Sequence, residues 1–356
     1  MIVGAEKLEL STVTLVDYKQ IRGATEQPMS GSINIIVIGA SVGGVDAIRA
    51  IVAGLPKNLN AAVFVTLHVG AHQSIFPELL NNVGTMTSSH AEQNEPIRTQ
   101  HIFVAPPDHH MTIERGKIVL TKGPRENLAR PAIDPMFRSA ARVYGSDVTG
   151  VLLTGGQNDG TAGLYEVKAQ GGRAIVQNPA NAVGSAMPQS AIDHVAVDDI
   201  LEIDEIAPLL VRIIDESSPT VFEAAGDLAT GDAQEKGMTA QFTQNHPVAV
   251  TCPDCGGALR QSELGSLTQF SCHIGHVYTA EIMLAAQFLV LERFVEQAMR
   301  SLNERAELCR AMKEKAVENG AASPDPWEAA MTEALDQTDV LQGLSSREWI
   351  HPSAEG

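Results

Sequence analysis

Residues 33–48, INIIVIGASVGGVDAI, decide how the rest of the chain is interpreted. Apolar, mostly β-branched residues run up to Gly39, and a helical pattern begins near Val45. The small residues between them leave room for one tight turn, and Ser41 stands at its centre. The stretch therefore predicts a strand, a turn and a helix. Such a turn either cradles the phosphates of a cofactor or presents a nucleophile.

Short apolar runs and helical patterns alternate from residue 33 to about residue 214. The expected strands are Ile33–Ile38, Ala62–Leu67, His101–Ala105, Gly150–Thr154 and Arg173–Gln177. The expected helices are Val45–Ala53, Ile75–Val83, Pro135–Tyr144, Gly163–Gln170 and Ile206–Ile214. A hairpin is expected from Met111–Glu114 and Lys117–Thr121. This alternation predicts an α/β fold with a doubly wound, mostly parallel sheet covered by helices on both faces.

The composition divides the rest of the chain into further segments. Residues 1–32 are weakly patterned and form an expected N-terminal extension, and residues 215–247 have the composition of a linker. Residues 248–279 form a small cysteine-bearing module, and residues 280–345 form a helical C-terminal region. Its long helix is expected to run from an N-cap at Thr279 to about Glu318, followed by a helix over 326–341.

Charge and composition exclude several classes of function. The formal net charge is −18 and the isoelectric point is about 5.0, which argues against general nucleic-acid binding and against docking on an anionic membrane. The first thirty residues lack a secretory signal, and no apolar stretch reaches the roughly 18–20 residues that span a bilayer. All the cysteines lie in the last third of the chain, which indicates a metal site in a reducing compartment. We therefore expect a cytoplasmic protein that is not inserted in a membrane.

The glycines of the opening stretch favour a nucleophile over a cofactor. Gly39, Gly43 and Gly44 do not form the G-x-G-x-x-G pattern of dinucleotide-binding turns, and the next expected strand ends at His68 where an acidic residue would be needed. No nucleotide-binding P-loop pattern occurs either. Residues 39–43 instead match G-x-S-x-G, the nucleophile turn in which glycines permit a sharp bend. Backbone N–H groups around Val42 and Gly43, at the start of the following helix, would stabilise an oxyanion.

Two further residues supply the partners that a nucleophilic serine needs. His68 follows the second expected strand, and Asp159 follows a later strand in the Gly-rich segment VLLTGGQNDGTAG. Each alone has an ordinary structural explanation, as a solvated histidine or a turn aspartate. Parallel strands, however, bring their carboxyl ends to one edge of the sheet, where open α/β folds place their sites. The pattern therefore predicts a Ser-His-Asp triad in a chain order that differs from that of α/β-hydrolases.

Six segments carry a resemblance to a known family. They are IGASVGG, TLHVG with FPELL, FVAPPDHHMTI, RPAIDPMFRSAA, LLTGGQNDGTAGL and VQNPANAVGSAMPQSAI. In this order they resemble the catalytic domain of the chemotaxis protein-glutamate methylesterase (CheB) family over residues 33–214. The resemblance implies a Rossmann-like hydrolase that removes methyl groups from glutamyl esters, and deamidates selected glutamines, on methyl-accepting chemotaxis receptors. It also implies that Ser41 is the nucleophile, His68 its base and Asp159 the group that orients the histidine.

The sequence departs from the family pattern at three places. A threonine commonly follows the serine, and this chain has Val42 there. A methionine that the family places beside the oxyanion is replaced by Gly156, so that part of the site is expected to be more open. Residues 1–32 are too short for the phosphoacceptor receiver domain that usually precedes the catalytic domain, so inhibition by such a domain is not expected in cis.

These departures leave alternatives to a receptor methylesterase. One is a non-catalytic regulatory or binding module on an esterase fold whose site has drifted. Another is an esterase for a different substrate. Intact Ser41, His68 and Asp159 oppose the first alternative, while Val42 and Gly156 favour it.

The cysteine module has the spacing of a zinc site. Cys252 and Cys255 form a C-x₂-C pair, and Cys272 and His276 follow as C-x₃-H after sixteen intervening residues. Three thiolates and one imidazole are a usual tetrahedral ligand set for structural Zn²⁺, and His273 is an alternative fourth ligand. The module also resembles a zinc-ribbon-like tail found on some members of the CheB family. Catalysis itself is expected to need no cofactor.

Overall fold

A computed structural model describes residues 33–70, 74–216, 246–319 and 325–347. The expected N-terminal extension, and the expected linker except for its first and last residues, lie outside the described residues. Within the described residues, none of the helices combines the length and apolar character that a bilayer-spanning segment requires.

The sheet that carries the site has seven strands in the order β3-β4-β2-β1-β7-β8-β9, and neighbouring strands run parallel. The strands are β1 (Asn34–Ala40), β2 (Ala61–Leu67), β3 (Thr87–His90), β4 (His101–Val104), β7 (Val148–Leu152), β8 (Arg173–Gln177) and β9 (Asp199–Leu201). This confirms the doubly wound, mostly parallel α/β fold. The order places β1 between β2 and β7, so the loops that follow these three strands are neighbours.

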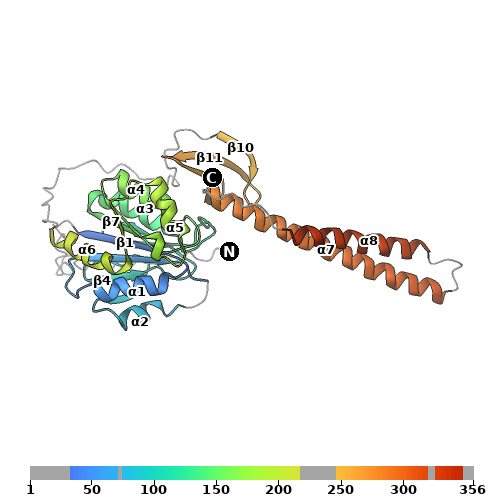
Figure 1. The fold of residues 1–356 in the computed structure, drawn as a ribbon, viewed down its shortest axis with the longest axis horizontal. Helices are drawn as coiled ribbons and strands as arrows, with labels where there is room; N and C mark the ends of the chain where they lie inside the picture. Colours follow the sequence, from blue (N-terminus) through green and yellow to red (C-terminus); the bar gives the residue numbers. More distant parts are fainter. Residues whose placement is uncertain (1–32, 71–73, 217–245, 320–324, 348–356) are drawn as a thin grey trace, which may run out of the picture. The chain divides into compact units, whose positions relative to one another are not determined.

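Helices cover both faces of the sheet (Figure 1). The helices α1 (Gly44–Gly54), α2 (Phe76–Asn81) and α6 (Ile203–Glu216) share a core with Ile36 and Ile38 of β1. The helices α3 (Ile133–Tyr144), α4 (Thr161–Ala169) and α5 (Ala186–His194) share a second core with Ile35 and Val37. Successive residues of a strand face opposite sides, which explains why an unbroken apolar run supplies both cores.

The expected hairpin is also present. The strands β5 (His110–Glu114) and β6 (Lys117–Thr121) pair in antiparallel register across Arg115 and Gly116. Gly116 has a φ of 76°, a conformation that glycine adopts without steric penalty. Two short 3₁₀ turns, Gly145–Asp147 and Pro179–Asn181, complete this part of the chain.

The C-terminal part of the chain contains an antiparallel sheet and two helices. The sheet has the order β10 (His246–Thr251), β11 (Ala258–Leu264), β12 (Leu267–Cys272) and β13 (Val277–Thr279). Leu259 and Tyr278 of the sheet pack with Ile282 and Met283 of α7 in a small core. The helix α7 (Ala280–Glu318) starts after Thr279 as expected, and α8 (Asp325–Ser345) pairs with it through the Lys313–Glu328 ion pair at 3.0 Å.

Candidate active site

Ser41 occupies a tight turn between β1 and α1. Its N–H donates to the carbonyl of Thr154 at 2.9 Å, and its carbonyl accepts the N–H of Gly44 at 2.8 Å. Gly43 has φ 75° and ψ 0°, the angles of the third residue of a type II turn, where glycine is strongly preferred. A Cβ at Gly43 would also lie 2.6 Å from the Cβ of Val183. The turn therefore depends on Gly43, as the sequence pattern predicts.

The structure brings Ser41, His68 and Asp159 together. Each follows a strand, β1, β2 and β7 respectively, at the carboxyl edge of the sheet. The Ser41 Oγ lies 3.1 Å from His68 Nδ1, and His68 Nε2 lies 2.7 Å from Asp159 Oδ2. The Asp159 side chain is fully buried, and the His68 side chain is 18% exposed. Substrate can therefore reach the serine and histidine while the carboxylate is shielded from water.

The Asp159 carboxylate determines which ring nitrogen of His68 carries the proton. An ionised carboxylate only accepts hydrogen bonds, so Nε2 is protonated and donates to Asp159. In the neutral ring the lone pair of Nδ1 then faces Ser41, whose hydroxyl donates to it. His68 is thus oriented to accept the proton of the serine hydroxyl, which is the geometry of a general base.

Asp159 accepts hydrogen bonds at both of its carboxylate oxygens. Oδ2 accepts from His68 and from the N–H of Ile133 at 2.6 Å, while Oδ1 accepts from Asn127 Nδ2 at 2.9 Å and from the N–H of Asp134 at 3.3 Å. Ile133 and Asp134 form the N-terminus of α3, where the helix dipole favours an anion. Burial raises the pKa of Asp159, but the hydrogen bonds and charge of His68 and the N–H of Ile133 outweigh it and hold the pKa below its ordinary value.

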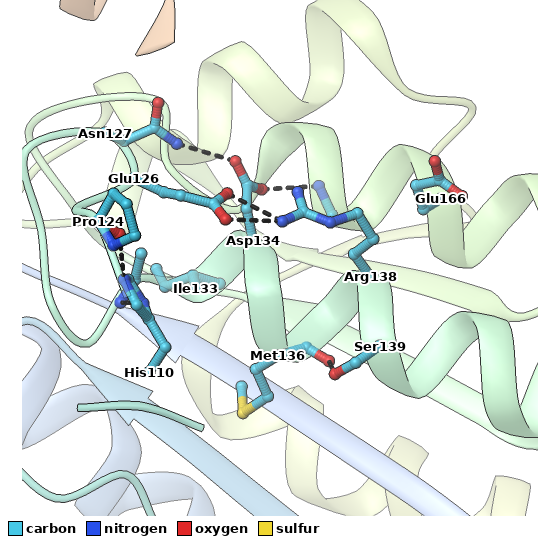
Figure 2. Close-up of polar contacts among 12 residues, drawn as sticks. His110, Pro124, Glu126, Asn127, Ile133, Asp134, Met136, Arg138, Ser139 and Glu166 are labelled. Atoms are coloured by element: carbon cyan, nitrogen blue, oxygen red, sulfur yellow. Dashed lines mark hydrogen bonds and ion pairs between the residues drawn. The ribbon is translucent and has the colours of Figure 1, made fainter. Parts of the chain in front are cut away.

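A second buried carboxylate shares the amide of Asn127. Asp134 Oδ2 accepts from Asn127 Nδ2 at 2.8 Å, as Figure 2 shows, and Asp134 Oδ1 accepts from the N–H of Gly163 at 2.7 Å. Burial and the charge of Asp159 raise the pKa of Asp134 well above its ordinary value, although the nearby Arg138 opposes this. Two adjacent carboxylates disfavour each other's ionisation, and Asp159 is the one that the site keeps charged.

Figure 2 also shows Arg138 donating to both oxygens of Glu126, at 2.8 and 2.9 Å. This ion pair fixes the segment that precedes Asn127. Residues Glu126, Asn127, Asp134 and Arg138 were not identified from the sequence. The resemblance did single out the segment that contains Asp134 and Arg138, but no local pattern indicates that their side chains surround the triad carboxylate.

Val42 and Gly43 directly follow Ser41 in the turn, and Gly156 lies two residues after Thr154, whose carbonyl accepts the N–H of Ser41. Val42 is 58% exposed, and its backbone carbonyl accepts the Thr154 hydroxyl at 2.8 Å. Among the described residues, no acceptor takes the N–H of Val42 or of Gly43. A Cβ at Gly156 would have no atom within 4 Å, so space for a side chain exists there. Two backbone donors thus follow Ser41 in the chain, and the position of Gly156 has room for a side chain.

The four expected metal ligands form one cluster. The ligand atoms of Cys252, Cys255, Cys272 and His276 all lie within 4.8 Å of one another. Cys255 Sγ is 3.8 Å from Cys272 Sγ, and His276 Nδ1 is 3.4 Å from Cys272 Sγ and 3.6 Å from Cys252 Sγ. A tetrahedron with ordinary Zn–S and Zn–N bonds has edges of about 3.8 and about 3.5 Å. The spacing therefore suits a four-coordinate metal ion.

Neighbouring groups support the ligands. The Tyr278 hydroxyl lies 3.4 Å from Cys252 Sγ and donates to Asp254 Oδ2 at 2.8 Å, and the same oxygen lies 3.7 Å from His276 Nε2. Burial raises the pKa of the Cys272 thiol, but the N–H groups of residues 274–276 outweigh it and lower the pKa. His273, the alternative ligand, is not part of the cluster. Cys309 is buried in α7 and does not belong to the cluster.

Comparisons with known proteins agree with the resemblance. A family model described as CheB methylesterase matches residues 36–210. A relative from Leptospira interrogans, named putative protein-glutamate methylesterase/protein-glutamine glutaminase, is 37% identical over 180 residues, which cover 50% of this chain and 93% of that protein. A Yersinia pestis protein-glutamate methylesterase/protein-glutamine glutaminase is 38% identical over 193 residues, which cover 52% of this chain and 55% of that protein. The solved catalytic domain of the Thermotoga maritima CheB methylesterase is 32% identical, with a TM-score of 0.49, over 51% of this chain and 99% of that domain.

Proposed function

Because this chain belongs to the CheB methylesterase family, we propose that it hydrolyses glutamyl γ-methyl esters, with Ser41 as the nucleophile. The observation that carries the proposal is the continuous hydrogen-bonded chain from Ser41 Oγ through His68 to Asp159. The substrate that we propose is a methylated chemotaxis receptor. The protein would reach it in the cytoplasm, and the formal net charge of −18 argues against nucleic acid as a partner.

The first half of the reaction forms an acyl-enzyme. His68 Nδ1 accepts the proton of Ser41 Oγ as that oxygen bonds to the γ-carbonyl carbon, and the carbonyl electron pair moves onto its oxygen. The N–H groups of Val42 and Gly43, which have no acceptor among the described residues, would donate to this oxyanion. When the tetrahedral intermediate collapses, the bond between carbon and the methoxy oxygen breaks, and methanol leaves with the proton from His68.

The second half of the reaction restores the serine. His68 accepts a proton from water as the water oxygen bonds to the glutamyl carbon. Collapse of this intermediate breaks the bond to Ser41 Oγ, which regains its proton from His68 and releases the glutamate. Asp159 stays ionised throughout and stabilises the histidine while it is charged. The same reaction steps on a glutamine side chain release ammonia in place of methanol, which would account for a glutaminase activity.

We further propose that Zn²⁺ is the metal of the cysteine cluster and that its role is structural. Cys252, Cys255, Cys272 and His276 would hold it, and the ligand distances fit a closed tetrahedral site without a position for substrate. When bound, the ion would neutralise thiolates and tie β10, β11, β12 and β13 together. The chemistry of ester hydrolysis stays with residues 33–214, and residues 248–279 form a separate metal-binding module.

Release of methanol tests this function. Purified protein is incubated with methylated receptor membranes, and methanol is measured for the wild-type chain, for Ser41→Ala and for Ser301→Ala, a serine on α7 whose hydroxyl bonds the carbonyl of Gln297. We expect release by the wild type and by Ser301→Ala, and none above background by Ser41→Ala. Equal release by all three proteins would refute Ser41 as the nucleophile. No release by any of them would favour a different ester or a non-catalytic binding role.

A further inference from the structure

The end of the metal module contacts the loop that holds Asn127. The N–H of Asn127 donates to the carbonyl of Val277 at 2.8 Å, and Glu126 pairs with Val277 as an isolated parallel bridge. The N–H of Thr279 donates to Asn127 Oδ1 at 3.2 Å. Residues 277–279 therefore bind both the backbone and the side chain of Asn127, which is 1% exposed.

Thr279 also binds the residue that precedes Asp159. Its hydroxyl donates to Asn158 Oδ1 at 2.6 Å, and Asn158 Nδ2 donates to Glu281 Oε2 at 2.7 Å. The hydroxyl of an N-cap threonine usually binds the first turn of its own helix, but that of Thr279 makes no capping bond to α7. This fully buried hydroxyl instead binds the segment that carries the triad aspartate.

Both contacts lead directly to Asp159. Asn127 accepts from Thr279 at Oδ1 and donates to Asp159 at Nδ2, so one amide joins the two residues. Asn158 is bonded covalently to Asp159 and is held at both ends of its side chain by the first turn of α7. When a buried side-chain amide loses one hydrogen-bond partner, its oxygen or NH₂ group is left unsatisfied, and the amide reorients to recover a hydrogen bond.

The position of Thr279 in turn depends on the cysteine cluster. The ligand His276 lies directly before Val277, and the hydroxyl of Tyr278 lies 3.4 Å from Cys252 Sγ and donates to Asp254 Oδ2 at 2.8 Å. The strand β13, Val277–Thr279, pairs with β12 in the small sheet, and β12 ends at the ligand Cys272. A change at the cluster therefore alters the anchor of the residues that hold Asn127 and Asn158.

We propose that Thr279 is a positioning residue for the Ser41–His68–Asp159 triad and that metal in the cysteine cluster keeps it in place, so that the state of the C-terminal module sets the reactivity of Ser41. This inference rests on the proposed function. It gives the metal module a role in the catalytic domain's chemistry through hydrogen bonds to Asn127 and Asn158. It also identifies Asn127 as the residue through which the module acts on the carboxylate.

The test compares two variants of Thr279 with a matched control in the full chain. Thr279→Val removes the buried hydroxyl at nearly constant volume, whereas Thr279→Ser keeps the hydroxyl and loses only the methyl group. Thr338→Val removes another buried hydroxyl, which bonds the Ala334 carbonyl in α8. The rate at which a fluorophosphonate labels Ser41 reports its reactivity. The downfield proton resonance of the His68 Nε2–Asp159 Oδ2 hydrogen bond reports the geometry of the triad.

We expect Thr279→Val to label about tenfold more slowly, which corresponds to about 1.4 kcal/mol in the barrier, and to shift or broaden the downfield resonance. Thr279→Ser and Thr338→Val should match the wild type in both measurements. Unchanged labelling and an unchanged resonance in Thr279→Val would overturn the role of Thr279. An equal slowing in Thr338→Val would also overturn it, because the effect would then be general destabilisation.

The metal arm uses the wild-type chain and Cys255→Ser. Zinc content is measured before and after chelation and after Zn²⁺ is added back, together with the downfield resonance. We expect loss of zinc to broaden the resonance and added Zn²⁺ to restore it in the wild type but not in Cys255→Ser. A resonance that does not respond to zinc would refute the coupling. Labelling uses no methyl ester, so failure of the proposed function would appear in methanol release alone.

Discussion

Replacement of Asp159 by asparagine should show how much the carboxylate contributes to kcat, by orienting His68, and how much it contributes to the free energy of unfolding. Every group around the Asp159 carboxylate is a donor: His68 Nε2, the N–H of Ile133, the N–H of Asp134 and Asn127 Nδ2. The asparagine amide has one oxygen and one NH₂ group, so in either orientation its NH₂ group would face two of these donors without an acceptor for them. If the NH₂ group faces His68, the ring must protonate Nδ1, and the lone pair that accepts the Ser41 proton is lost.

The size of the effect follows from these contacts. The wrong tautomer in a serine–histidine–aspartate triad lowers kcat by about 10⁴-fold, or about 5.5 kcal/mol. If the NH₂ group faces Asn127 and Asp134 instead, two buried donors lose their acceptor, at about 1–3 kcal/mol each. We therefore expect Asp159→Asn to lower kcat by about 10³–10⁴-fold and the free energy of unfolding by about 2–4 kcal/mol.

The assay is methanol release from a methylated receptor, with urea unfolding of the same samples. Asp134→Asn is the matched control, because Asp134 is equally buried and shares Asn127 but makes no hydrogen bond to His68. Burial and the charge of Asp159 already raise the pKa of Asp134, so a neutral amide disturbs it less. The reasoning is refuted if Asp159→Asn keeps wild-type kcat, or if Asp134→Asn loses as much activity as Asp159→Asn.

Further predictions concern three glycines and a buried histidine. Gly156→Met should leave stability unchanged, because a Cβ there meets no atom within 4 Å, and should raise kcat several-fold by restoring the methionine that the family has at this position. Gly155→Ala should lower the unfolding free energy by about 1–3 kcal/mol, because its Cβ would lie 2.4 Å from Met187 Cε. Kinetics and urea unfolding check both variants, and a lower kcat in Gly156→Met would contradict the role of the open position. Gly43→Ala should slow Ser41 labelling, because its φ of 75° and its contact with Val183 leave no room for a Cβ. Burial, and then Arg98, lower the pKa of His101 to about 4, so the unfolded chain binds a proton near pH 6.5 that the folded chain excludes, and stability should fall as the pH drops from 6.5 to 4. His101→Gln should flatten that fall in urea titrations, and an equally steep fall in the variant would show that other groups cause it.

The sequence predicted those parts of the fold that leave a local pattern. The strands β1, β2, β7 and β8 are buried on both faces and therefore appear as continuous apolar runs. The strand β3, with the sequence TSSH, was missed because it lies at the sheet edge and has polar side chains. The strand β9 is only three residues long, and α5 carries Pro188 near its start, so neither gives a clear periodic signal.

The same distinction holds for the site. The grouping of Ser41, His68 and Asp159 could be predicted because each follows a strand and parallel strands share one carboxyl edge. The clustering of Cys252, Cys255, Cys272 and His276 could be predicted because their spacing is local, and the cluster includes His276 but not His273. Asn127 and Thr279 are separated by 152 residues, and only tertiary structure joins them. Asp134 and Arg138 were missed because a buried carboxylate on an apolar helix has no sequence pattern that assigns its partners.

The most direct test of the central claim is to map the residue that a fluorophosphonate modifies. The reagent reacts only with a serine whose hydroxyl is activated by a neighbouring base. Wild-type protein and Ser41→Ala are treated with the probe, digested and analysed by mass spectrometry. We predict a single adduct on the peptide that contains Ser41, and no adduct in Ser41→Ala. An unmodified wild-type chain, or an adduct on a different serine, would contradict the assignment of Ser41 as an activated nucleophile.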